Sequence, residues 1–337
     1  MALLSDISEF LKHHWMLVSF LAPVLWAAVN VIDVYFVGKI YDDELDGTII
    51  SGIFQIIPFS ILSLFFLKID VGQFVSIGGS GSLFWIDPIV LLALLGGFLF
   101  TSSFYFYFKA LFKHNDVAFL QIIWGLTIIA VPLMTFFFWG ERLSALKYAG
   151  MGITLLGAIL LSVSKKLRDK FSFGYLWVMI WAVIILSLSM VFEDKVYSDL
   201  SARGLGDQGF LIGFLGFTLG AFLAGVFFAL AKKRNPFPLI KRFALIFLLF
   251  EGISFLGNLA SQRAIDIAPS VSYVATIETF VPVFILIDSL LILFIFWLIL
   301  KKKTSIMKRI YQEQLDGIWI KALATVIMAI GVYIISN

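Results

Sequence analysis

Two glutamates lie well inside long apolar runs of this sequence, Glu251 within 243–264 and Glu278 about a quarter of the way along 270–300. An ionisable side chain in the middle of a bilayer costs about 2.5–3.5 kcal/mol even on the mildest scale, so such positions are functional candidates by default. We predict that these two residues take part in substrate or proton coupling. Asp288 lies further along the second run, where its depth is least defined, and we leave it outside the predicted site. The second glutamate has polar neighbours: Ser272, Thr276 and Thr279.

A further polar group lies in the first apolar run. Asn30 and Asp33 share a helical face with Trp26, because spacings of three and four residues align on a helix. Their counterparts in the second half of the chain are roughly Glu193 to Lys195. We therefore add Asn30, Asp33 and Glu193 to the candidates for substrate or proton coupling. The alternative for Asp33, Glu193 and Asp194 is structural, because lipid head groups solvate charges near a helix end.

The elements that carry these residues follow from composition. Of 337 residues, 61% are hydrophobic and only 14% are charged, against roughly 25% charged in a soluble domain. A bilayer span takes about 20 apolar residues, so the chain has room for about ten spans. We expect an all-α membrane protein with ten transmembrane helices. Its apolar runs are 15–38, 47–67, 88–108, 117–139, 145–164, 174–194, 208–231, 243–264, 270–300 and 318–335.

Several classes of function are disfavoured. A net charge of +3 gives no reason to expect a nucleic-acid partner, and the absence of cysteine excludes disulfides and thiolate metal sites. The only histidines are His13, His14 and His114, all at the ends of apolar runs, so we expect no metal site, no cofactor and no enzyme.

Residues 1–14 read as an amphipathic lead-in without a cleavage site, and residues 77–82 read as a Gly/Ser linker.

The chain contains an internal repeat. An offset of 150 residues aligns Ala110 with Ala260, Lys113 with Arg263, Asp116 with Asp266, Ala118 with Ala268, and Val131 and Pro132 with Val281 and Pro282. Towards the end of each half the offset is 174, which aligns Lys147 with Lys321, Gly157 with Gly331 and Ser162 with Ser336. The halves are 15–164 and 174–337, with a basic linker at 165–173 and an insertion at about 290–315. Five spans are an odd number, so we expect two inverted five-helix repeats, the design of many secondary transporters.

The stretch 109–163 resembles the second part of an EamA domain of the drug/metabolite transporter superfamily. The resemblance rests on a small-residue helix end, a helix with a late proline, the turn Gly140, Glu141 and Arg142, and a Gly-rich helix. It covers nearly the whole chain as two such domains, and the Gly-Glu turn is missing from the second. The resemblance implies ten helices and secondary transport or export of a small metabolite. We thus expect a small-molecule solute and membrane lipid as partners, in the plasma (inner) membrane; the sequence assigns no oligomeric state.

Other features have structural explanations as well as functional ones. Pro132 and Pro282 each remove a helix hydrogen bond, so each could serve as a kink or a hinge. The pairs Lys113/Asp116 and Arg263/Asp266 are spaced to neutralise each other at a helix end. A stripe of small residues, Gly216, Gly220 and Ala224, favours close helix packing. We expect the aromatic runs 104–108 and 136–139 to face lipid or anchor the interface rather than to form a cation-binding cage.

Two other functions stay open. Residues 204–207 read Gly-Leu-Gly-Asp, as in intramembrane aspartyl proteases, but the Tyr-Asp partner is absent from the sixth span. Asp207 also suits a helix N-cap. A non-transporting receptor or scaffold is the other alternative.

Two arguments about orientation disagree. Of the Lys and Arg residues, 18 lie on the side reached after odd-numbered spans and seven on the other. Because positive charge gathers in cytoplasmic loops, this count places both termini outside. The family resemblance implies both termini inside, and we follow the charge count.

Overall fold

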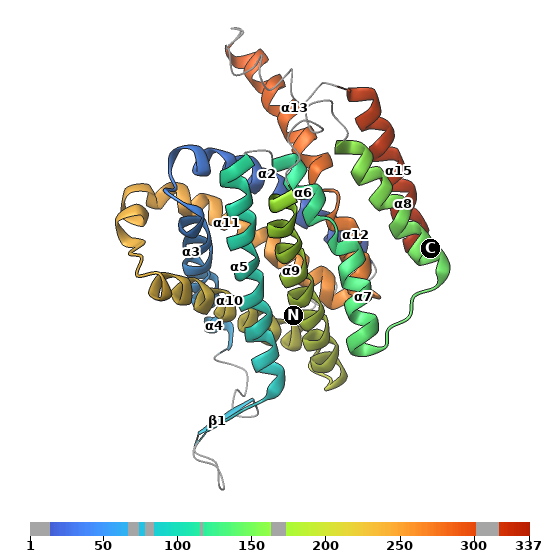
Figure 1. The fold of residues 1–337 in the computed structure, drawn as a ribbon. Coiled ribbons are helices and arrows are strands. Elements are labelled where there is room, and N and C mark those ends of the chain that lie inside the picture. The colour runs from blue at the N-terminus through green and yellow to red at the C-terminus, as the bar shows by residue number, and fades with distance from the viewer. Residues whose placement is uncertain (1–13, 67–73, 78–83, 115–116, 163–172, 301–316) are drawn as a thin grey trace.

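The computed structural model describes residues 14–66, 74–77, 84–114, 117–162, 173–300 and 317–337 (Figure 1). Residues 1–13 of the lead-in at 1–14, most of the linker at 77–82, nearly all of the basic linker at 165–173 and much of the insertion lie outside these residues. Within them the chain is almost entirely helical, as predicted. The exception is a small hairpin in which β1 (Val75–Ile77) pairs antiparallel with β2 (Phe84–Ile86).

The helices follow the predicted apolar runs closely. They are α2 (Trp15–Lys39), α3 (Glu44–Phe54), α4 (Ile56–Phe66), α5 (Pro88–His114), α6 (Val117–Trp124), α7 (Thr127–Trp139), α8 (Ala145–Ser162), α9 (Phe173–Ala202), α10 (Gly206–Ala231), α11 (Phe237–Ile267), α12 (Val271–Glu278), α13 (Val281–Leu300) and α15 (Ile318–Ser336). In the described part of the chain, nine helical segments are long and apolar enough to cross a membrane. A shorter apolar helix at 145–161 corresponds to the tenth predicted run. The protein is therefore built as a multi-pass membrane protein.

Three of the predicted runs are broken into two helices each. The breaks lie at Gln55 between α3 and α4, at 125–126 between α6 and α7, and at 279–280 between α12 and α13. Pro58 and Pro282 follow the first and third breaks within three residues. Each occupies the first turn of the next helix, where a missing N–H costs little. The second break falls at Gly125, seven residues before the nearest proline.

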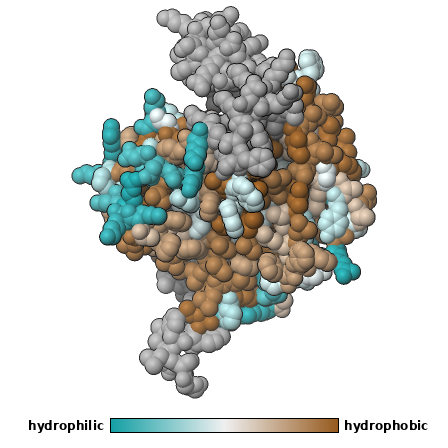
Figure 2. Space-filling model, viewed as in Figure 1, coloured by the Kyte–Doolittle hydropathy of each residue, from teal (hydrophilic) through white to brown (hydrophobic). Residues whose placement is uncertain are grey.

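The helices pack in pairs that join distant parts of the chain. Helix α2 packs against α11, α5 against α9 and α10, α3 against α10, and α8 against α15. In Figure 1 the hairpin and the outer end of α13 lie at opposite ends of the molecule. Figure 2 shows hydrophobic residues over the middle of the same face, with hydrophilic ones mainly at its left edge. The exposed apolar belt suits contact with lipid tails.

Small residues allow the closest of these contacts. A Cβ atom at Gly216 would lie 2.6 Å from the Cβ of Ala93, and one at Gly220 would collide with the backbone of Leu94 in α5. The predicted stripe on α10 therefore faces α5. In the α8–α15 pair, a Cβ at Gly157 would lie 2.8 Å from the carbonyl oxygen of Ala324. Both interfaces depend on direct backbone contact, as is common for membrane helices.

Candidate functional site

A cavity lies inside the bundle, and both halves of the chain contribute to its wall. It has an empty volume of about 730 Å³, including its mouth. Its wall is formed mainly by α2, α5, α6 and α7 from the first half and by α11, α12 and α13 from the second. The polar side chains that line it are Asn30, Asp33, Ser51, Gln121, Thr127, Ser254 and Glu278. The aromatic ones are Trp26, Phe100, Phe104, Tyr107, Phe108, Trp124 and Phe250.

Asn30 is the centre of a hydrogen-bonded network in the cavity wall. Its Oδ1 accepts from the Tyr107 hydroxyl at 2.7 Å and from Nε2 of Gln121 at 2.8 Å. Its Nδ2 donates to the backbone oxygen of Trp26 at 2.7 Å. The Trp26 indole in turn donates to Oδ1 of Asn258 in α11 at 3.3 Å. These bonds tie α2 to α5, α6 and α11 and fix the side-chain positions around the cavity.

Asp33 lies one helical turn from this network and is 4% exposed. The Tyr107 hydroxyl interacts with its carboxyl group, but Oδ1 has no hydrogen-bond partner among the described residues. Glu251 is close enough for the two charges to repel. The Ser51 hydroxyl, which lines the cavity, donates to Oε1 of Glu251 at 3.0 Å, and Oε2 has no partner in the described part of the chain. Two carboxyl groups are thus buried near each other, and each has one oxygen without a hydrogen-bond partner among the described residues.

Glu278 also reaches the cavity. It is the last residue of α12, directly before the break at 279–280, and it lines the cavity. The Ser261 hydroxyl of α11 donates to its Oε1 at 2.6 Å. Of the five residues predicted for substrate or proton coupling, Asn30, Asp33 and Glu278 therefore line one cavity, and Glu251 lies behind Ser51 at its edge.

Glu193 lies elsewhere. Helix α9 continues beyond it to Ala202, so Glu193 is not near a helix end, and its side chain is fully buried against Gly96 of α5. Neither carboxyl oxygen has a hydrogen-bond partner among the described residues. Its neighbour Lys195 pairs with Asp199 at 2.7 Å. Glu193 does not line the cavity.

The remaining predicted features are placed as follows. Pro282 starts α13 beside Val281, which lines the cavity, whereas Pro132 lies inside α7 and contributes to a separate apolar groove between α7 and α8. Arg263 binds Asp266 at 2.5 Å, as the spacing of the pair predicts. It also binds Asp207 at 2.7 Å and so links the end of α11 to the start of α10. Asp116 of the first pair lies outside the described residues.

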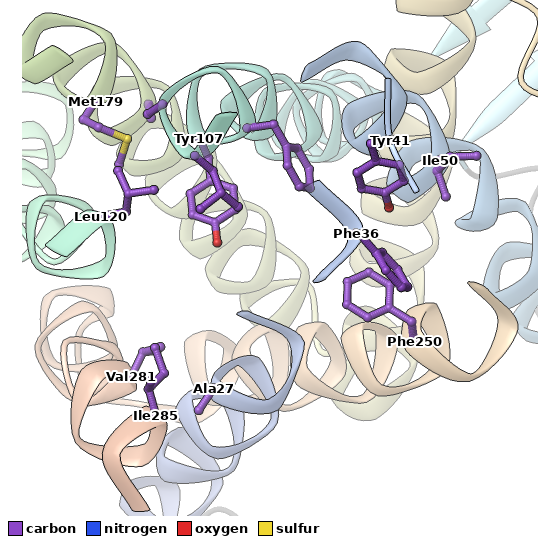
Figure 3. Packing of buried hydrophobic residues seen from close by; sticks show 14 of the residues in the cluster. Ala27, Phe36, Tyr41, Ile50, Tyr107, Leu120, Met179, Phe250, Val281 and Ile285 are labelled. Atoms are coloured by element: carbon purple, nitrogen blue, oxygen red, sulfur yellow. The ribbon is translucent and has the colours of Figure 1, made fainter. Parts of the chain in front are cut away.

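Sequence reasoning missed most of the aromatic part of the cavity wall. Phe104, Tyr107 and Phe108 were expected to face lipid, but Tyr107 and Phe108 are each 2% exposed and all three line the cavity. Figure 3 shows the Tyr107 hydroxyl pointing toward the middle of the bundle. Gln121 and Trp124 were also missed. The run 136–139 behaves as expected, with all four side chains exposed.

Comparisons with known proteins show the fold and no more. No protein-family model matches this sequence, and no curated protein matches it. A solved structure described only as "Crystal structure of protein" is similar to this chain, with a TM-score of 0.58 and 15% sequence identity. The match covers 96% of this chain and 96% of that one. The helical arrangement is therefore shared with an experimentally determined protein along nearly its whole length.

Proposed function

We propose that the protein is a secondary transporter or exporter of a small metabolite that works by alternating access between two inverted five-helix repeats. The observation that carries this proposal is the cavity, which both halves line and which contains buried carboxyl groups. Transporter sites commonly lie at the interface of two repeats and next to broken helices. Here Gly125 and Glu278 stand at the breaks in the fourth span of each half, and both line the cavity.

The pattern of helix packing supports the repeat. Helix α2, the first span of the first half, packs against α11, the third span of the second half. The equivalent contact with the halves exchanged is that of α9 with α5, and both contacts are extensive. The second spans, α3 and α10, pack against each other, and so do the fifth spans, α8 and α15. These contacts support a two-fold relation between the halves. The sequence resemblance to EamA domains points the same way.

The buried carboxyl groups suit proton coupling. Glu251 and Glu278 each receive one serine hydrogen bond, and no ion pair to either of them is found among the described residues. A carboxyl group in such surroundings favours its neutral form, and the arrival of a solute or of water can release the proton. In this proposal the solute triggers proton release from Glu278 directly, because Glu278 lines the cavity. Proton release from Glu251 is triggered indirectly, through Ser51 and Asp33.

Transport can be tested with purified protein in lipid vesicles that contain a pH-sensitive dye. We expect at least one class among amino acids, nucleosides, sugars and organic cations to show pH-dependent flux. Glu278→Gln should abolish this dependence without reducing expression, whereas Asp288→Asn, a matched change outside the cavity, should retain it. The absence of flux for every class with wild-type protein would contradict transport. Unchanged pH dependence in both Glu278→Gln and Glu251→Gln would contradict coupling through these residues.

The orientation proposed from the charge count places both termini outside the plasma (inner) membrane. The exposed cluster Lys232, Lys233 and Arg234 between α10 and α11 would then face the cytoplasm. A reporter fused after Asn337 that is active only in the cytoplasm should give no signal. A signal would reverse the orientation and leave the two-repeat architecture untouched.

A further inference from the structure

The cavity carries acidic groups without a basic partner. Asp33 and Glu278 line it, and no Lys, Arg or His is found among the described residues of its wall. We propose that the cavity binds an organic ammonium cation. This inference rests on the proposed function, because it takes the cavity to be the solute site and names the chemical class of the solute.

Electrostatics favours a cation over other solutes. A buried carboxylate without a partner is strongly unfavourable, and a cation that pairs with it removes much of this cost. Oδ1 of Asp33 and Oε2 of Glu251 have no hydrogen-bond partner in the described structure, and the two groups repel each other when both are ionised. An anionic solute would meet carboxyl groups and find no guanidinium or ammonium group in the wall. A positive charge in the cavity would instead pair with Asp33 and reduce its repulsion with Glu251, which lies behind Ser51.

The aromatic wall distinguishes an organic ammonium from a bare metal ion. Tyr107 and Trp124 form a corner, with ring centroids 5.3 Å apart and an interplanar angle of 84°. Phe104 stacks on Trp124 at 6.0 Å and 22°, and Phe100 packs edge-on against Phe104 at 4.9 Å. Aromatic faces attract ammonium groups, and cages of such rings recognise alkylated ones. A metal ion would need several oxygen ligands where this wall presents rings.

Binding of the cation should release protons. Each carboxyl group that is neutral in the empty cavity must lose its proton to pair with an ammonium group, so one proton leaves for each carboxylate formed. The titratable groups facing Asp33 are Tyr107 from α5, Glu251 from α11 and Tyr41 after α2. Glu278 faces the Ser261 hydroxyl. Cation entry coupled to proton exit would make the transporter an exchanger.

Calorimetry on the full chain in lipid nanodiscs tests this inference. The probes are 2-phenylethylammonium and tetramethylammonium, with 2-phenylethanol and phenylacetate as neutral and anionic matches of the first. We expect 2-phenylethylammonium to bind at least tenfold more tightly than either match. Its affinity should rise with pH, and the heat should depend on the buffer because protons are released. Failure of both ammonium probes to bind, or equal binding of phenylacetate, would overturn the inference.

Variants locate the site and separate this inference from transport itself. Asp33→Asn, Glu278→Gln and Trp124→Leu should each weaken ammonium binding at least tenfold, and Asp288→Asn should not change it. Unchanged binding in all three cavity variants would overturn the assignment. Ammonium binding without flux in vesicles would refute transport but retain the cation site. Flux of a different solute class without ammonium binding would support transport and refute the cation site.

Discussion

Two buried polar regions of the molecule are built in opposite ways. Around Asn30, each acceptor and donor that ties the neighbouring helices together is used, at distances of 2.7–2.8 Å. At Glu251, and separately at Glu193 outside the cavity, carboxyl oxygens are buried without partners in the described structure. A satisfied network fixes one geometry, whereas an unsatisfied one is unfavourable until a ligand or a proton completes it. The Asn30 region therefore forms the frame of the site and Glu251 its responsive part, whereas Glu193 lies outside the cavity.

The largest effect on stability should come from breaking the satisfied network. Asn30→Leu leaves the Gln121 amide without this acceptor and removes one acceptor of the Tyr107 hydroxyl, which keeps its interaction with the Asp33 carboxyl group. A buried polar group left unpaired costs about 1–3 kcal/mol, and the lost bond of Tyr107 adds about 1 kcal/mol, so we expect a loss of about 2–4 kcal/mol in unfolding free energy, measured by denaturant titration in detergent.

A graded comparison controls for simple loss of packing. Tyr107→Phe removes one donor and leaves the Gln121 bond to Asn30 in place, so its cost should be smaller, about 1 kcal/mol. Equal losses in Tyr107→Phe and Asn30→Leu would mean that the network does not act through Asn30.

A smaller effect of opposite sign is expected in the unsatisfied region. Glu193→Met replaces a fully buried and unpartnered carboxyl group by an apolar side chain of similar length. Replacing buried charges by apolar groups is often neutral or stabilising, and we expect a gain of roughly 1 kcal/mol, seen as a higher melting temperature in detergent. A large destabilisation would show that Glu193 makes favourable contacts in the folded state.

The smallest effect concerns an ion pair at the membrane edge. Arg203 binds Asp87 at 2.5 Å directly before α5, and this hydrogen bond lowers the pKa of the Asp87 carboxyl. The carboxylate therefore stabilises the fold above its unfolded pKa of about 3.9, and this contribution is lost as the pH falls through the lower folded value. Arg203 is nearly half exposed, so screening keeps the effect small, below about 1 kcal/mol.

This prediction is measured as the acid limb of a thermal melting profile. Asp87→Asn should lose the stabilisation and show a shallower decline below about pH 4, which is the range of the unfolded aspartate. An identical acid limb in both proteins would contradict a stabilising role for the pair.

The sequence predicted the helices better than their ends and breaks. Hydropathy detects the apolar part of a helix, so it missed the polar turns that carry α9 on to Ala202 and start α11 at Phe237. It also missed the break at Gln55, because only the following Pro58 marks it. Helix ends outside the bilayer depend on local hydrogen bonding, which composition does not record.

The site was predictable where a charge interrupts an apolar run. Asp33 and Glu278 stand out on that ground, and both line the cavity. Tyr107 and Trp124 do not stand out, because 17% of the residues are aromatic and nothing in a single side chain tells lipid from cavity. That distinction depends on the rotation of each helix, which is set by packing against neighbours far along the chain.

The α8–α15 contact has a consequence for synthesis. The Thr154 hydroxyl approaches the backbone oxygen of Met328, 174 residues later in the chain. At about 5–20 residues per second, α8 waits roughly 10–35 s in the membrane before this partner emerges. During that time the small-residue face around Gly150 and Gly157 is open to other helices. The fold of the first half is thus completed only after α15 has been synthesised, and a ribosome that stalls before α15 leaves the small-residue face of α8 uncovered.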